Sequence, residues 1–306
     1  MTHAILVANT RSGSRAITAT RVERLAAALR AKGIDVATFP SRPLGEQIAL
    51  TASPDYDMVV VAGGDGTIRS VAEATLAAPK PIAILPFGTM NMLAKELGLP
   101  LDPDAALALI GDRSVTKMVD VGLAEGKVFL HSALFGLPVR LGTHRERRRG
   151  VLAFFDKLWI GLHTLATMRR DQRLTLAEIA GDGRAHGEVV ATSIVALVGE
   201  PSTELLPVPR RSRVDAGYLT VFAIAAASPP DVVRSILHEA IGTLDEDDTI
   251  RIVRAPSAVV DSPRRKMHVL LDGERHLFAT PMVIEIRAKA QPMIVSARGT
   301  GTEDGE

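Results

Sequence analysis

The sequence predicts an α/β protein in which an N-terminal parallel-sheet domain is followed by a mostly antiparallel, β-rich second domain. In the first third, continuous apolar runs alternate with helix-like segments, as in a parallel sheet covered on both faces. From about residue 125, short strand-like runs separated by turn-rich stretches indicate an antiparallel sheet. A chain of 306 residues accommodates two domains. We expect them to cover 1–124 and 125–281, with about 282–298 packing back on the first.

The elements of the first third follow from its apolar pattern. A helix predicted over 21–33 closes at Gly33, which suits a C-cap. Another helix is predicted from Thr67, whose hydroxyl can cap it. Its buried face is expected to carry Ile68, Val71, Thr75 and Leu76. The runs expected to be strands are 3–9, 34–40, 57–63 and 81–87.

Short strands are expected to dominate the rest of the chain. They are 127–136, 188–199, 217–225, 249–255, 257–262, 266–274 and 281–288. One long amphipathic helical pattern, near 150–170, interrupts them and is flanked by arginines. Such a stripe usually packs on a core, although arginines beside aromatic residues also suit a peripheral membrane contact.

Composition and charge exclude several classes of function. With 46% apolar residues, 23% charged residues and a net charge of +1, the chain has no overall field that would attract nucleic acid. The absence of cysteine excludes disulfides, thiolate metal sites and cysteine nucleophiles. No apolar run approaches membrane-spanning length, and the N-terminus lacks the pattern of a signal peptide. We therefore expect a cytoplasmic protein, with any membrane contact peripheral and at the inner face.

A glycine-rich turn, GGDGT at residues 63–67, follows the third predicted strand. Gly63, Gly64 and Gly66 let a ligand approach the main chain without a Cβ in the way. Amides of the loop and of the helix start then converge on one place, which favours an anion such as phosphate. A tight turn with Asp65 in solvent explains a single loop of this kind equally well.

Two more loops favour the phosphate-site interpretation. Their small and polar residues are Asn9, Ser12 and Gly13 after the first strand, and Pro86, Gly88, Thr89 and, on the next helix, Asn91 after the fourth. All three loops leave strands at the same edge, where ligands of parallel sheets bind. The loops contain neither G-x-x-x-x-G-K-[ST] nor G-x-G-x-x-G, so the two nucleotide folds that carry those patterns are excluded.

An acidic turn lies near the end of the second domain. An apolar run there leads into Asp272, Gly273 and Glu274. An Asp-Gly hairpin turn accounts for these residues by itself. The eight histidines show no zinc-binding spacing, and His131 is expected to be a satisfied core or cleft residue.

Four segments together resemble the diacylglycerol-kinase catalytic family of lipid kinases, which includes sphingosine kinases. They are GGDGTIRSVAEATL (63–76), LPFGTMNMLAKELGLP (85–100), NTRSG (9–13) and LLDGE (270–274). The first is shared with NAD kinases, whereas the second is similar to the lipid-kinase branch. The resemblance spans nearly the whole chain. It implies a two-domain enzyme, with ATP in the cleft between its domains, that phosphorylates a lipid hydroxyl.

The resemblance also implies an ATP site, a Mg²⁺ ion and a general base. The residues implied to line the nucleotide are Asn9, Ser12, Gly13, Ser41, Gly63, Gly64, Asp65, Gly66, Thr67, Gly88, Thr89 and Asn91. A carboxylate beside a polyphosphate is repelled unless a cation or a proton lies between them, so we interpret Asp65 as facing Mg²⁺ or the acceptor hydroxyl. In this family DGE carries the base, for which Glu274 is the first choice and Asp272 the second.

The acceptor side departs from the family pattern. RVDAGYLTV resembles a segment whose consecutive Asp-Asp-Gly helps to hold a structural Mg²⁺. Asp215 and Gly217 are present, so Asp215 is the implied metal residue, but Ala216 replaces the second aspartate and offers no carboxylate. Glu200 likewise stands where the family usually has asparagine.

Three functions remain open. The favoured one is an ATP-dependent kinase of a lipid such as diacylglycerol or a sphingoid base, with residues 145–170 as a candidate peripheral contact with the membrane that holds the substrate. An NAD-kinase-like enzyme shares the GGDGT loop, and a non-catalytic lipid-binding protein on the same fold would fit Ala216. The basic run 145–149 lacks interleaved aromatics, so no nucleic-acid partner is expected, and a homodimer is left open.

Overall fold

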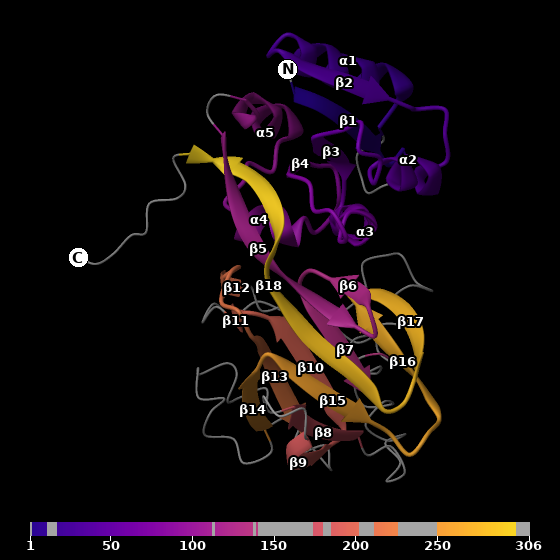
Figure 1. Cartoon of the computed structure of the whole chain (residues 1–306), viewed down its shortest axis with the longest axis vertical. Helices are drawn as coiled ribbons and strands as arrows, with labels where there is room; N and C mark the ends of the chain where they lie inside the picture. Colours follow the sequence, from indigo (N-terminus) through magenta and orange to yellow (C-terminus); the bar gives the residue numbers. More distant parts are fainter. Residues whose placement is uncertain are drawn as a thin grey trace, which may run out of the picture. The chain divides into compact units, whose positions relative to one another are not determined.

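The computed structural model describes residues 2–10, 17–111, 114–136, 139, 174–179, 185–201, 211–225 and 250–297. The chain divides into two compact units (Figure 1). Unit 1 is Met1–Val121 with Ala288–Glu306, and unit 2 is Gly122–Arg287. The assignment of ATP binding to the first part and of lipid binding to the second remains a prediction.

Unit 1 is built on four parallel strands. They are β1 (Thr2–Ala8), β2 (Ile34–Thr38), β3 (Met58–Gly63) and β4 (Ile82–Pro86), in the order β2-β1-β3-β4. Nearly every residue of β1, β3 and β4 is buried, which explains their continuous apolar runs. In the sheet, β2 lies on one side of β1, whereas β3 and then β4 lie on the other side. The order therefore reverses between β1 and β3, and a ligand crevice is expected outside the carboxyl ends of these two strands.

Helices follow the strands of unit 1 as the pattern predicts. They are α1 (Ala19–Arg30), α2 (Leu44–Leu50), α3 (Asp65–Ala74), α4 (Met92–Glu96) and α5 (Pro103–Leu109). Gly33 takes φ +79° just beyond α1, as expected of a glycine that ends a helix. Two predicted starts are wrong. Gly64, not Thr67, is the N-cap of α3, and Asn91 precedes α4 in the left-handed conformation instead of lying in it.

The last part of β18 (Met282–Ser296) joins unit 1. Met293 pairs in parallel with Ile82 of β4, and the Lys289 amide donates to the buried Asp120 of β5 (Ser114–Ala124) at 2.7 Å. The fully buried Gln291 donates from Nε2 to the Lys80 carbonyl at 2.8 Å. The Lys80 ammonium in turn donates to the carbonyls of Thr51 and Ser53, just past the end of α2.

Lys80→Met should destabilise the chain by about 1–3 kcal/mol, because two carbonyls lose their donor. Burial lowers the pKa of the Lys80 amine below 10.5, and nearby Asp55 and Asp57 offset this only in part. At a pH between the lowered pKa of Lys80 in the folded chain and its ordinary value of 10.5, the unfolded chain holds a proton on Lys80 that the folded chain has lost. Stability conferred by Lys80 therefore rises with pH through that alkaline window. Urea unfolding of wild type and Lys80→Met at a series of pH values measures this effect. The difference between their free energies of unfolding should widen towards pH 10.5, and a difference that stays constant with pH would contradict the prediction.

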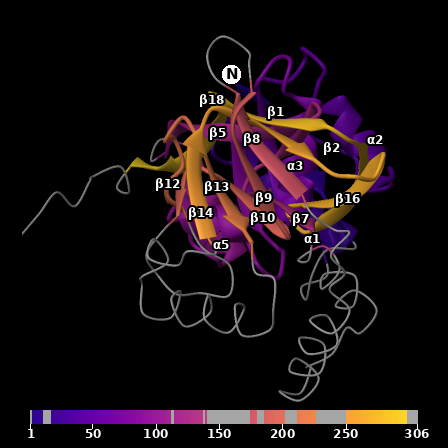
Figure 2. The same ribbon diagram turned by 90° about the horizontal axis from the view of Figure 1, so that it is seen from below.

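The described residues of unit 2 form a separate pair of short strands and two larger antiparallel sheets. One has the order β14-β13-β10-β7-β16-β17, from β14 (Ile250–Ala255), β13 (Leu219–Ile224), β10 (Ser193–Val198), β7 (Ser132–Gly136), β16 (Lys266–Leu271) and β17 (Glu274–Ala279). Figure 2 shows β13 and β14 side by side. In the other, the first part of β18 pairs with β15 (Ser257–Asp261), which pairs with β8 (Leu174–Ile179) and then β9 (Ala185–Ala191). The smaller strands are β6 (Lys127–Phe129), β11 (Glu200–Pro201) and β12 (Arg211–Arg213).

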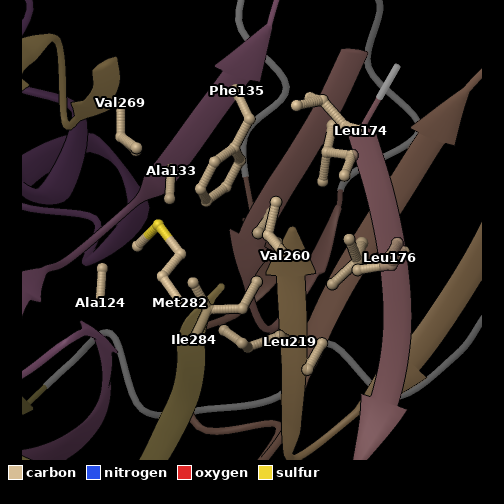
Figure 3. Close-up of a cluster of buried hydrophobic side chains, with 14 of the residues drawn as sticks. Ala124, Ala133, Phe135, Leu174, Leu176, Leu219, Val260, Val269, Met282 and Ile284 are labelled. Atoms are coloured by element: carbon tan, nitrogen blue, oxygen red, sulfur yellow. The ribbon is translucent and has the colours of Figure 1, made fainter. Parts of the chain in front are cut away.

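The two sheets of unit 2 share one apolar core. Phe135 of β7 lies in the same buried cluster as Val260 of β15 and Met282 of β18 (Figure 3). The α/β class, with a parallel sheet followed by an antiparallel β-rich part, is thus confirmed. Details differ, since the run 127–136 breaks into β6 and β7, and 188–199 divides at Thr192. The amphipathic pattern at 150–170 lies outside the described residues.

Candidate functional site

The loops after β1 and β3 meet at the carboxyl edge of the unit 1 sheet. Asn9 follows β1, and its Nδ2 donates to Oγ1 of Thr67 at 3.1 Å. Its main-chain amide donates to the carbonyl of Ala62 at 3.0 Å. These bonds join the two strands between which the strand order reverses, which is where ligands of such sheets bind.

The loop after β3 brings bare backbone to the same place. A Cβ on Gly63 would lie 2.9 Å from Cβ of Thr67, so only glycine permits this tight entry into α3. Gly64 caps the helix without a side-chain hydrogen bond to its first turn. Main-chain amides at a helix start carry partial positive charge, and the chemistry of this edge suits an anion.

The loop after β4 packs directly on that glycine turn. The Phe87 amide donates to the Gly63 carbonyl at 3.0 Å. A Cβ on Gly88 would lie 2.5 Å from Cα of Gly64 and 2.7 Å from Oδ1 of Asn91. Asn91 is buried, and its Nδ2 donates to the Gly88 carbonyl at 2.9 Å. The contact depends on glycine at position 88.

Asp65 is placed at the start of two helices. It lies in the first turn of α3, and its Oδ1 accepts the Leu93 amide of α4 at 3.2 Å. Both helix starts favour a negative charge, so they stabilise the ionised carboxylate. Asp65 is partly exposed and directly follows Gly64, whose Cα lies against Gly88 of the next loop. A carboxylate there can face a cation that accompanies a bound anion.

The remaining residues implied for the nucleotide lie further out or outside the described residues. Thr89 is exposed beside Gly88, and Ser41 is exposed after β2, at the same edge but on the outermost strand. Ser12 and Gly13 fall outside the described residues. The structure therefore brings together the predicted residues of three loops: Asn9, Gly63, Gly64, Asp65, Thr67, Gly88 and Asn91.

A hollow of about 350 Å³ opens in unit 1 beside Phe87. It is lined by Thr18, Thr20, Arg21, Arg24, Phe87, Asp102 and Pro103. Arg21 makes two 2.7 Å hydrogen bonds to the carboxylate of Asp104. Sequence reasoning missed this hollow, although the one-turn spacing of Arg21 and Arg24 at the start of α1 was a signal.

In unit 2, Asp272 is bound by the main chain of a distant segment. Its carboxylate accepts the amides of residues 130, 131 and 132 at 2.6, 2.8 and 2.9 Å, and its own amide donates to the Ser132 carbonyl at 2.9 Å. Asp272 and Gly273 have φ of +48° and +86° and form the turn between β16 and β17, as the Asp-Gly hairpin interpretation predicts. Asp272 therefore has a structural role, in which it fixes the segment that carries the buried His131.

Glu274 is more open to solvent than Asp272, whose carboxylate is enclosed by main-chain donors. Glu274 is the first residue of β17, and 49% of its side chain is exposed. One carboxylate oxygen lies 4.0 Å from Nε2 of His276. An exposed carboxylate of this kind can approach an acceptor hydroxyl without breaking the fold.

Comparisons with known proteins show to which family the chain belongs. Residues 3–124 match the model of the diacylglycerol kinase catalytic domain. A protein named probable lipid kinase YegS-like, from Pseudomonas aeruginosa PAO1, is 41% identical over 72% of this chain and 70% of its own. Its namesake from Pseudomonas fluorescens is 31% identical over 74% and 73%. The chain belongs to the diacylglycerol kinase-like lipid kinase family. The diacylglycerol kinase of Bacillus subtilis is a more distant relative, at 26% identity over 72% of each chain.

Solved structures share the fold of this lipid kinase family member. A diacylglycerol kinase from Bacillus anthracis has a TM-score of 0.70 at 22% identity, covering 97% of this chain and 98% of that one. An NAD kinase from Archaeoglobus fulgidus in complex with ATP has a TM-score of 0.50 at 14% identity, covering 97% and 93%. Among the described residues, no helix is long and apolar enough to cross a membrane.

Asp272→Ala should destabilise this lipid kinase family member by about 2–4 kcal/mol, because three main-chain donors lose one charged acceptor. Glu274→Gln is the matched control in the same hairpin and should change stability by less than about 0.5 kcal/mol. Chemical denaturation of the three proteins measures both effects. Equal stability of Asp272→Ala and wild type would show that the segment at 130–132 does not depend on this carboxylate.

Proposed function

We propose that the protein is an ATP-dependent lipid kinase that transfers the γ-phosphate to a hydroxyl of a lipid such as diacylglycerol or a sphingoid base. The observation that carries the proposal is the joining of three glycine- or asparagine-bearing loops, one of which carries Asp65, at the carboxyl edge of the unit 1 sheet. Membership of the lipid kinase family supports the reaction class.

In this proposal, unit 1 binds the nucleotide. The bare main chain at Gly63, Gly64 and Gly88 lets phosphates approach, and the amides at the start of α3 stabilise their charge. A shared fold with an NAD kinase that was solved in complex with ATP supports this use of the edge. Asp65 fits a Mg²⁺ ion that arrives with ATP, since such ions take one or two protein carboxylates and complete their shell with phosphates and water. The ion would neutralise charge on the transferring group.

Unit 2 is proposed to supply the base. Glu274 accepts the proton of the lipid hydroxyl as the oxygen–phosphorus bond forms and the bond from the γ-phosphorus to ADP breaks. Asp272 is the second choice, because its oxygens already accept three main-chain amides. If Glu274→Gln folds normally but no longer turns over substrate, the result supports Glu274 as the base. Retained turnover in Glu274→Gln moves the role to Asp272.

A transfer assay tests the proposed function. Wild type, Asp65→Asn and Glu274→Gln are each incubated with γ-labelled ATP, Mg²⁺ and either diacylglycerol, a sphingoid base or NAD. Label in one lipid that is lost in Asp65→Asn supports the proposal and identifies the acceptor. Label in NADP would establish the alternative NAD-kinase activity. Liposome binding without any transfer would establish a non-catalytic lipid-binding protein, and either outcome overturns the proposal.

A further inference from the structure

The structural metal that the family resemblance implies at Asp215 does not fit the residues of this chain. We infer that the segment 211–218 of unit 2 is held by protein contacts alone, with the Arg213 side chain in the role of the missing cation. The inference does not depend on the proposed function, because it concerns the folding of unit 2.

The ligand set around Asp215 is inadequate for a divalent ion. The adjacent position carries Ala216, which offers no oxygen ligand from its side chain. Oδ1 of Asp215 lies 3.8 Å from Nε of Arg213, whose fixed positive charge repels a metal ion. Over the part of the chain that the structure describes, no three acidic or histidine side chains are grouped so that they could hold a metal. One carboxylate already paired with a guanidinium is a poor site for Mg²⁺ or Ca²⁺.

Main-chain contacts hold the segment in place instead. β12 pairs with β11 through Glu200 opposite Arg213 and Pro201 opposite Arg211. The Gly199 amide donates to the Tyr218 carbonyl at 2.8 Å. These bonds bracket Asp215 on both sides along the chain, so the turn that contains it is closed without a ligand.

Gly199 makes this closure possible. Its φ is +81°, and a Cβ there would lie 2.7 Å from the Arg213 carbonyl and 3.5 Å from Cβ of Ala216. Thr220 donates from Oγ1 to the Gly199 carbonyl at 2.7 Å, and Val214 is buried at 3% exposure. The Ala216 methyl thus lies where the segment packs on the end of β10.

The carboxylates in and beside the segment are already compensated without a metal. Besides the pair of Arg213 with Asp215, Nη2 of Arg254 lies 3.9 Å from Oε1 of Glu200. Arg211 is a further cation of the segment and is buried at 5% exposure. Each of the two carboxylates therefore has a guanidinium beside it, and a divalent ion would add charge where it is already compensated.

The first experiment is thermal unfolding of the full chain without nucleotide, in EDTA and in excess Mg²⁺. The midpoint temperature should agree within about 1 °C between the two, and the metal content after gel filtration should be below about 0.1 ion per chain, as expected of a fold that binds no ion. A lower midpoint in EDTA, or one bound ion per chain, would overturn the inference. Arg213→Gln should lower the midpoint by about 1–3 °C through loss of the ion pair, and Mg²⁺ should not restore it.

The second experiment restores the site. Arg213→Gln combined with Ala216→Asp should gain a Mg²⁺-dependent rise of about 3–6 °C at roughly tenfold excess of ion over its dissociation constant. Arg213→Gln with Ala216→Asn, equal in size but without the carboxylate, is the matched control and should not respond. If the double variant that carries Ala216→Asp gained no response, the arginine and the missing acid would not be what excludes the metal. Activity is not a readout here, so failure of this inference leaves the proposed function untouched.

Discussion

Gly88→Ala is expected to weaken binding of Mg-ATP by about 10- to 100-fold, the equivalent of about 1–3 kcal/mol of overpacking. The new Cβ would lie 2.5 Å from Cα of Gly64, which is backbone and cannot rotate away as a side chain can. The loop after β4 must therefore move away from the glycine turn after β3, which disrupts the contact between two loops of the proposed nucleotide site. Titration calorimetry with a non-hydrolysable ATP analogue measures the affinity.

Gly45→Ala is the matched control for this substitution. Gly45 lies in α2 of the same unit, without positive φ, and a Cβ there meets nothing within 4 Å. The affinity of the Gly45→Ala variant for the ATP analogue should equal that of wild type. Wild-type affinity in Gly88→Ala would mean that the contact between the two loops is irrelevant to nucleotide binding.

Asp65→Asn is expected to lower kcat/KM for lipid phosphorylation by about 1,000-fold while leaving the fold intact. Asparagine keeps an oxygen that can accept the Leu93 amide, so α4 stays in place. It removes the charge that the proposed Mg²⁺ requires. Steady-state kinetics in mixed micelles measure the loss of activity, and the unfolding midpoint shows whether the fold is intact.

Asp65→Ala distinguishes charge from structure at the same position. It removes the charge and also the acceptor of the Leu93 amide, so it should lower stability by about 1 kcal/mol more than Asp65→Asn does. If Asp65→Asn retained more than about a tenth of wild-type turnover, Asp65 would be a helix cap and not part of the reaction.

Local patterns were sufficient to predict the strands in the first third of the chain. The buried strands β1, β3 and β4 and the glycine that ends α1 follow from apolar runs and from residue preferences that act over a few positions. β5 and β17 are among the strands that were missed, as are β8, β11 and β12. The first half of β5 is mostly exposed, and five of the six residues of β17 are not buried, so neither has the apolar run used to find strands.

The candidate site was predicted in composition but not in its contacts. The three loops could be placed at one edge because parallel strands all end there. Their joining bonds could not be predicted, since Asn9 and Thr67 are 58 residues apart and Asp65 and Leu93 are 28 apart. Asp272 reaches the segment at 130–132 from about 140 residues away, which no local pattern records.

Hydrogen exchange of main-chain amides, measured with and without a saturating non-hydrolysable Mg-ATP analogue, tests the central claim most directly. Peptides that contain residues 63–67 and 87–93 should exchange at least about 10-fold more slowly with nucleotide. The proposal places their amides either against the phosphates or in the hydrogen bonds that join the two loops. Peptides from the edge strand β14 of unit 2 and from its neighbour β13 should be unchanged. Bound nucleotide with unchanged exchange in both loops would contradict the claim that these loops form the ATP site.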